Sequence, residues 1–157
     1  MKQYTLSRSA RLASPLPEVF PFFASAANLE EITPPWLNFE FLSDKNVPME
    51  VGARIQYRIR LHGIPVRWTT KITVWNPPYE FVDEQISGPF RRWVHQHRFE
   101  STPDGGTIAS DRVFYSVPGG ALIHRLFVKG DLDRIFDYRE KVMLELFDRQ
   151  DEESPVG

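Results

Sequence analysis

Residues 90–116 constrain the fold of this chain more than any other stretch. Two runs with the composition of strands flank a Pro-Asp-Gly-Gly sequence at 103–106, a pattern that predicts a β-hairpin. Side chains two apart on a strand share a face. One face of the first strand therefore carries Trp93, His95, His97 and Phe99, and one face of the second carries Ala109, Asp111, Val113 and Tyr115.

The pairing of these two strands brings the two faces together on one surface. A hairpin loop with an odd number of residues places His97 near Asp111 and Trp93 near Tyr115. A surface that combines aromatic rings with two imidazoles and a carboxylate is too polar for an ordinary core and too aromatic for an ordinary exterior. We therefore expect this surface to form the wall of a cavity.

The composition is that of a globular protein and excludes several classes of function. The 157 residues suit one domain, and a 13% aromatic content supplies large rings that fill or line a large volume. A net charge of -2 argues against nucleic acid as a partner. The lack of cysteine excludes disulfides and thiolate chemistry. Because no apolar signal segment or membrane span is evident, we expect a cytoplasmic protein.

Most of the chain before the hairpin has the pattern of antiparallel strands. Strands are predicted at 3–12, 39–43, 53–62, 66–75 and 80–87, with Gly63-Ile64-Pro65 as a turn. In the 53–62 strand the alternation turns Ile55, Tyr57, Ile59 and Leu61 inward. Two short helices follow the first strand, one beginning near Pro17 and one capped by Asn28.

The C-terminal part changes to a helical period. Residues 121–149 predict one long helix, with Gly130 as a kink or break, and residues 151–157 form a polar tail. The apolar stripe of this helix consists of Val128, Leu132, Ile135, Val142 and Leu146, widened by Phe136, Met143 and Phe147. The sequence thus predicts one α+β domain at 1–150, in which a curved antiparallel sheet of about six or seven strands wraps around the long helix. One helix cannot fill a deep curved sheet, so a cavity is expected between them.

This layout resembles the helix-grip fold of the SRPBCC superfamily, which includes START lipid-transfer domains, birch-pollen-allergen-like proteins and the polyketide cyclase/dehydrase group. Several motifs are similar to those of small bacterial members: the segments 17–23, 28–37, 81–85 and 88–90, Trp93-x-His95-x-His97-x-Phe99, Asp111-x-Val113-x-Tyr115 and Ile135-Phe136-x-Tyr138-Arg139. The resemblance implies a pocket for a hydrophobic or amphipathic small molecule, such as a lipid, a polyketide or an aromatic compound. It identifies neither a ligand nor a reaction.

The residues predicted to bind the ligand come from the inward strand faces and the helix stripe. They are Ile55, Tyr57, Ile59, Trp68, Trp93, His95, His97, Phe99, Asp111, Val113, Tyr115, Leu132, Ile135 and Phe136. Within this set, His95, His97 and Asp111 would orient a polar group of the ligand. We predict no cofactor and no metal.

The same polar trio permits other interpretations. His95-x-His97 with Asp111 has residue types that can chelate a metal. A His-Asp pair can act as the general base of a cofactor-free cyclase or dehydratase. The trio can also be a hydrogen-bonded structural cluster. A third class of function is an interaction module without a ligand. The sequence leaves open whether the protein is an enzyme, and leaves its oligomeric state open as well.

Overall fold

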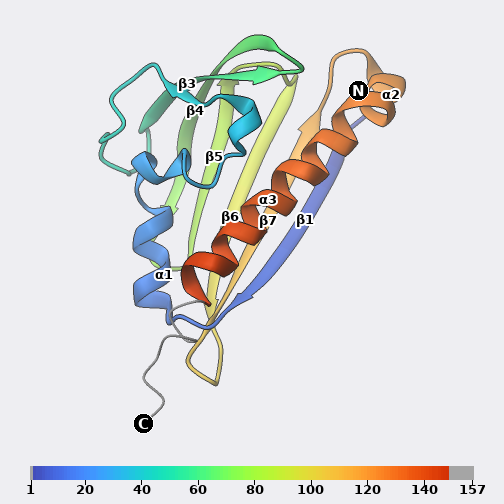
Figure 1. The fold of residues 1–157 in the computed structure, drawn as a ribbon. Coiled ribbons are helices and arrows are strands. Elements are labelled where there is room, and N and C mark those ends of the chain that lie inside the picture. Colours follow the sequence, from blue (N-terminus) through green and yellow to red (C-terminus); the bar gives the residue numbers. More distant parts are fainter. Residues whose placement is uncertain (1, 149–157) are drawn as a thin grey trace.

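The computed structural model describes residues 2–148, which form a seven-stranded antiparallel sheet with helices on one face (Figure 1). The strands lie in the order β1-β7-β6-β5-β4-β3-β2. Their bounds are β1 Tyr4–Leu12, β2 Glu40–Phe41, β3 Arg54–Leu61, β4 Ile64–Asn76, β5 Glu80–Ser87, β6 Arg92–Ser101 and β7 Thr107–Ser116. This sheet and the long terminal helix confirm the predicted fold class. The predicted polar tail and the last residue of the predicted helix, Arg149, lie outside the described residues.

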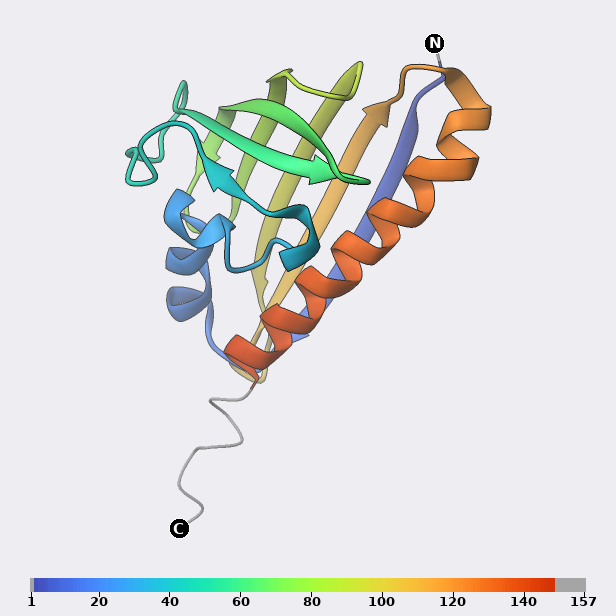
Figure 2. The ribbon, with the colours of Figure 1, turned by 45° about the horizontal axis from the view of Figure 1, so that its top comes forward.

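The helices divide the face of the sheet between them. The N-terminal group consists of α1 (Leu16–Phe23) and two short 3-10 helices, η1 (Ala26–Leu29) and η2 (Pro35–Leu37). The C-terminal group is continuous, from α2 (Gly120–Ile123) through a π-helical turn, η3 (His124–Val128), to α3 (Lys129–Phe147). Figure 2 shows α3 running in front of β7 and β1, while α1 lies away from it, toward the other edge of the sheet. None of the described helices is long and apolar enough to cross a membrane.

Two boundaries of the sheet differ from the prediction. Ile64 and Pro65 belong to β4 and do not form a turn, because His62 and Gly63 alone reverse the chain with φ angles of 52° and 80°. Two consecutive residues with positive φ are what a two-residue type I′ hairpin turn requires. The strand predicted at 39–43 is shorter and contains only Glu40 and Phe41, which pair with β3.

The helices also differ from the prediction in detail. Asn28 lies inside η1 and does not cap it; its Nδ2 donates to the carbonyl oxygen of Phe22 at 2.9 Å. Gly130 does not break the C-terminal helix, since the irregular turn is η3, immediately upstream. The helix start near Pro17 agrees with the structure, in which α1 begins at Leu16 and places a proline in its first turn.

The buried face of α3 consists of Leu132 from the predicted stripe, the three residues predicted to widen it, and Arg139, which was not predicted. The buried residues are Leu132, Phe136, Arg139, Met143 and Phe147, whereas Val128, Ile135, Val142 and Leu146 are only half-buried. Steps of three and four residues accommodate both sets on one broad face. The buried set includes Arg139, which therefore lies in the interface between the helix and the sheet.

Candidate functional site

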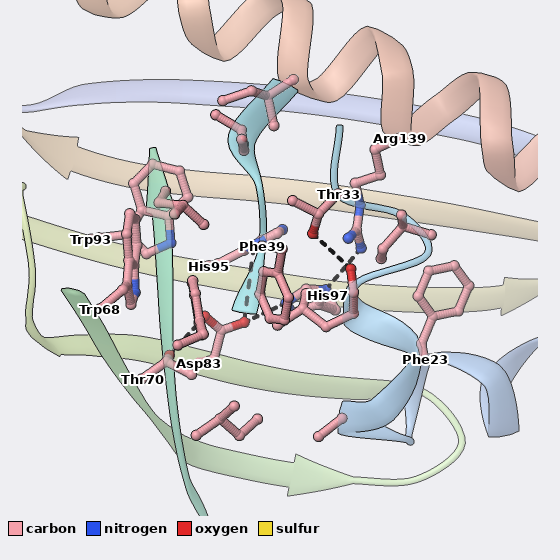
Figure 3. Close-up of a pocket in the computed structure, with 18 of the residues that line it drawn as sticks. Phe23, Thr33, Phe39, Trp68, Thr70, Asp83, Trp93, His95, His97 and Arg139 are labelled. Atoms are coloured by element: carbon pink, nitrogen blue, oxygen red, sulfur yellow. Dashed lines mark hydrogen bonds and ion pairs between the residues drawn. The ribbon is translucent and has the colours of Figure 1, made fainter. Parts of the chain in front are cut away.

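A cavity of about 230 Å³ lies between the concave face of the sheet and the helices (Figure 3). Its walls come from β3, β4, β5 and β6, from α1 and the 3-10 helices, and from α3. Most of the lining side chains are aliphatic or aromatic. Because α1 and α3 lie over different parts of the same face of the sheet, neither helix fills the space above the middle strands.

Ten of the fourteen residues predicted to bind a ligand line this cavity. They are Ile55, Tyr57, Ile59, Trp68, Trp93, His95, His97, Leu132, Ile135 and Phe136. The inward faces of β3, β4 and β6 supply seven of them, and α3 supplies the other three. The alternation read from the sequence therefore assigns the correct faces to these strands, Trp68 included.

The other four predicted residues, Phe99, Asp111, Val113 and Tyr115, do not line the cavity. The β6–β7 register is as expected, with Trp93 opposite Tyr115 and His97 opposite Asp111. However, β7 lies beneath α3 (Figures 1 and 2). Arg139 of α3 binds Asp111, and Val113 belongs to the same buried cluster as Leu132 and Phe136. Phe99 lies under α1, where its ring packs against Phe20 at 5.4 Å.

Five charged or titratable side chains form a buried polar cluster, which consists of Asp83, His95, His97, Asp111 and Arg139. His95 Nε2 is 2.8 Å from Asp111 Oδ1, and His97 Nε2 is 2.6 Å from Asp83 Oδ2. The two imidazole rings stack with their centroids 3.7 Å apart. From α3, Arg139 donates to both oxygens of Asp111, through Nη2 at 3.2 Å and Nε at 3.3 Å. Asp83, His95, His97 and Arg139 line the cavity, with Asp111 behind them.

The two histidine–aspartate pairs cross between strands. In the register, His95 lies opposite Asp83 of β5, and His97 lies opposite Asp111 of β7. Each histidine nevertheless hydrogen bonds to the carboxylate opposite its neighbour. Diagonal neighbours on adjacent strands remain within reach of long side chains. His97 stays near Asp111, with Nδ1 at 3.6 Å from Oδ1, but the short contact of Asp111 is with His95.

The electrostatics of the polar cluster fix most of its protonation states. Burial by itself would raise the pKa of Asp111, but Arg139 and the two histidines hold that pKa well below its ordinary value. Burial likewise opposes ionisation of Asp83, and the hydrogen bond from His97 still keeps its pKa low. Burial and the neighbouring His95 lower the pKa of His97 to about 4, against the opposing effect of Asp83. At neutral pH both carboxylates are therefore ionised and His97 is neutral.

These protonation states define which atoms are donors and acceptors. Neutral His97 donates from Nε2 to Asp83, so its Nδ1 is an acceptor for Arg139 Nη2 at 3.4 Å. His95 donates from Nε2 to Asp111. In the neutral form of His95, Nδ1 is then an acceptor 3.9 Å from Asp83 Oδ2. Two acceptor atoms therefore face each other at the cavity wall, at a separation that one shared donor can bridge.

A metal ion has one candidate set of ligands among the described residues. Donor atoms of Asp83, His95 and His97 lie within 4.8 Å of one another, and imidazole and carboxylate are common ligands. Coordination through His97 would break one of its hydrogen bonds, the one to Asp83 at Nε2 or the one from Arg139 at Nδ1. The guanidinium of Arg139, next to His97, already supplies a positive charge to the cluster.

The sequence prediction missed Asp83 and Arg139. Asp83 shares a strand face with Phe81, and both line the cavity. Arg139 follows Leu132 by seven residues and precedes Met143 by four, so it occupies a position on the buried face of the helix. At Asp83 and at Arg139 the sequence thus places a charged residue at a position where its helix or strand is otherwise buried. This pattern could have identified both residues as part of the site.

The fold, the cavity and the polar cluster together define a helix-grip protein with a hydrophobic-ligand-binding fold. Residues 12–138 match the model of the family described as polyketide cyclase / dehydrase and lipid transport. The chain belongs to this family, which confirms the resemblance to the SRPBCC superfamily. The comparison with curated protein sequences gave no match.

Solved structures support the same fold at low sequence identity. The Zhui aromatase/cyclase from Streptomyces sp. R1128 is 13% identical with a TM-score of 0.75, covering 95% of this chain and 96% of its own. Norcoclaurine synthase from Thalictrum flavum, in complex with a transition-state analogue, is 14% identical with a TM-score of 0.66, covering 92% and 96%. Protein Ms6760 from Mycobacterium smegmatis is 19% identical with a TM-score of 0.66, covering 90% and 89%. At these identities the likeness extends to the fold alone.

Proposed function

We propose that this protein binds a hydrophobic or amphipathic small molecule, of the lipid, polyketide or aromatic class, in the cavity between sheet and helices. The observation that carries the proposal is a 230 Å³ cavity with a mainly apolar wall and one localised polar cluster. Small-molecule sites combine these two properties, because the apolar wall provides affinity and a few polar groups fix orientation. A filled core would instead have favoured an interaction module without a ligand.

The polar cluster orients the ligand by offering acceptors. His95 Nδ1 and Asp83 Oδ2 are 3.9 Å apart on the cavity wall. A ligand hydroxyl or amine placed between them donates to one or to both. Its hydrogen bond to the ionised Asp83 is charge-assisted and therefore stronger than one between neutral groups.

A binding experiment with a cavity-filling variant tests the proposal. The fluorescent probe N-phenyl-1-naphthylamine should bind the wild-type protein. Ile59→Phe, which adds a ring to a buried position on the cavity wall, should weaken binding at least about tenfold, since added volume displaces the ligand. Ile64→Phe is the matched control, because Ile64 is 66% exposed and lies outside the cavity wall.

The controls also define what would contradict ligand binding. Equal probe affinity in the wild type and in Ile59→Phe would place the probe elsewhere on the protein. Native mass spectrometry of protein purified from its own host provides an independent measurement, in which a bound lipid or aromatic compound is expected. Protein that carries no adduct and does not bind the probe would count against the proposal.

A second function, catalysis of cyclisation or dehydration, is favoured by one further observation. His95, which lines the cavity, is held by the ionised Asp111 through Nε2, and its Nδ1 lies 3.9 Å from Asp83 Oδ2. This is the arrangement in which a carboxylate fixes the tautomer of a general base. In a dehydration, Nδ1 takes a proton from the carbon next to a substrate carbonyl. It returns that proton to the β-hydroxyl group, which leaves as water, so that no oxidant or cofactor is consumed.

Dehydration of 4-hydroxy-4-phenylbutan-2-one to its conjugated enone tests the catalytic proposal by absorbance. His95→Gln should reduce the rate at least about a hundredfold, as expected for loss of a general base, with probe affinity nearly unchanged. Tyr138→Phe, on the half-buried side of α3 and outside the cavity wall, is the control. A rate equal to that of the uncatalysed reaction, or a His95→Gln variant as active as the wild type, would argue against catalysis by this pair.

A further inference from the structure

The indole N–H of Trp68 is a buried donor without an acceptor in the described part of the chain. Side-chain polar atoms in this condition are found at Tyr4, Trp68 and Thr73. Of these three residues, only Trp68 lines the cavity. Trp68 is 6% exposed, so its N–H is also withdrawn from bulk solvent.

A buried indole N–H normally finds a partner, because leaving it unpaired costs the desolvation energy of the donor. The neighbouring rings offer little compensation. Trp93 lies perpendicular to Trp68 with the centroids 5.2 Å apart, and Phe90 lies 5.6 Å away. A ring face is at best a weak acceptor for an N–H group. An oxygen atom in the cavity would therefore satisfy this donor better than the protein does.

We propose that Trp68 Nε1–H is a ligand-binding donor that recognises a carbonyl or ether oxygen of the bound molecule. The inference rests on the proposed function and adds the chemical class of the ligand. Its aromatic or aliphatic ring system carries an oxygen acceptor at the Trp68 end and a hydroxyl or amine donor at the polar cluster. Figure 3 shows Trp68 and Trp93 at one end of the pocket, with Asp83 and the two histidines further along the wall.

The charges of the cavity favour a neutral acceptor over a carboxylate. The charged residues that line it, within the described part of the chain, are Asp83, Asp131 and Arg139. Arg139 is already bound to Asp111 behind the wall. Asp131 is likewise paired with Arg134. A ligand carboxylate at Trp68 would therefore meet the negative charge of Asp83 and no unpaired cation. A ketone oxygen accepts the same hydrogen bond without this repulsion.

The test compares two ligands of the same shape in two proteins. 2-Acetylnaphthalene and 2-ethylnaphthalene differ by a carbonyl in place of a methylene, and their affinities follow from displacement of N-phenyl-1-naphthylamine. Trp68→Phe keeps a ring at this position but removes the N–H. The ratio of ketone to hydrocarbon affinity should fall about tenfold in Trp68→Phe, as expected for loss of one hydrogen bond. The ratio cancels any effect of the smaller ring on both ligands.

Trp36→Phe is the matched control, because Trp36 is 52% exposed and lies outside the cavity wall; the affinity ratio should equal that of the wild type. A ratio unchanged by Trp68→Phe, with both compounds bound, would overturn the inference and leave ligand binding intact. Failure of both compounds to bind the wild type would contradict the proposed function, and the inference with it.

Nuclear magnetic resonance gives a second measurement that needs no folded Trp68 variant. The chain has four tryptophans, and Trp36→Phe, Trp75→Phe and Trp93→Phe assign the Trp68 indole signal by elimination. In the wild type, 2-acetylnaphthalene should move the Trp68 indole proton downfield, while 2-ethylnaphthalene should not. Equal shifts with the two compounds would contradict a hydrogen bond to this donor.

Discussion

Two groups of aromatic rings on the same face of the sheet differ in whether they fill the core or line the cavity. The phenylalanine cluster, near α1 and the end of α3, consists of Phe20, Phe23, Phe81, Phe99 and Phe147. The tryptophan end, toward β3 and the opposite ends of the central strands, consists of Phe39, Tyr57, Trp68, Phe90 and Trp93. Every member of the tryptophan end lines the cavity, whereas only Phe23 and Phe81 of the phenylalanine cluster do so.

The difference follows from what covers each group. The eight-residue helix α1 inserts Phe20 and Phe23 against Phe99, with ring centroids 5.4 and 5.1 Å apart. The tryptophan end shares its buried cluster with Leu37, the one buried residue of the three-residue helix η2, and with Leu132 and Phe136 of α3. Its rings pack against one another along the wall, as Tyr57 does between Phe39 and Trp68. The comparison teaches that one strand face can build a closed core or an open site, depending on the element that covers it.

Truncation of one phenylalanine in each group should give the largest contrast. Phe99→Ala should lower the free energy of unfolding by about 4 kcal/mol, because Phe99 is buried and its neighbours cannot fill the void. The affinity of the folded protein for N-phenyl-1-naphthylamine should stay within about twofold of the wild type. Urea unfolding and probe titration measure the two quantities.

Phe90→Ala is the matched substitution at the tryptophan end. Phe90 is half-buried and lines the cavity, so its loss should cost only about 1 kcal/mol of stability. It should weaken probe binding several-fold, because part of the wall is removed. If the two variants lost the same stability and bound the probe alike, the distinction between a closed and an open region would be wrong.

Arg139 connects the two regions through the polar cluster, and its removal should have the next largest effect. Arg139→Met keeps an unbranched side chain but leaves Asp111 buried without its cation. We expect a loss of about 3 kcal/mol in urea unfolding, since breaking a buried ion pair leaves an uncompensated charge. The double variant Arg139→Met/Asp111→Asn should recover part of this loss. Strictly additive losses would show that the two residues do not interact energetically.

Much of the fold could be predicted because its signals are local. The alternation in residues 53–62 and the turn at 103–106 report the conformation and register of individual strands. The helical period after Gly120 likewise reports the long helix and most of its buried positions, although it did not include Arg139 among them. These patterns depend on residues close together in the sequence. They can therefore be recognised without knowing which strands and helices pack against each other.

The partners in the candidate site depend on tertiary structure and were therefore harder to predict. His95 and His97 were identifiable from their spacing, but their carboxylate partners are on two different strands and are reached diagonally. The choice of diagonal partner depends on strand twist and on the docking of α3, which brings Arg139 to Asp111. Sequence periodicity contains neither quantity, so it assigned Asp111 to the cavity wall and overlooked Asp83.

The pH dependence of stability should give a smaller effect than the loss of Phe99 or Arg139, and it distinguishes the polar cluster from both apolar regions. His97 faces Asp83 of β5, His95 of its own strand, Asp111 of β7 and Arg139 of α3. Its pKa is about 4 in the folded protein against 6.5 ordinarily, so between these values the unfolded chain binds more protons. Stability must then rise with pH across this window and fall on acidification. We expect a loss of about 2 kcal/mol between pH 7 and pH 5.

His97→Gln should flatten this dependence, because the variant has no imidazole to protonate in the unfolded chain. Part of the slope should remain, since burial also lowers the pKa of His124 and contributes with the same sign. The control is Phe81→Leu, which removes the ring stacked on His97 at 4.1 Å from within the phenylalanine cluster. It should reduce stability by a similar amount at every pH and leave the slope almost unchanged. Equal slopes in the wild type and His97→Gln would mean that His97 is not held neutral by its surroundings, and the donor and acceptor assignments in the cavity would have to be reversed.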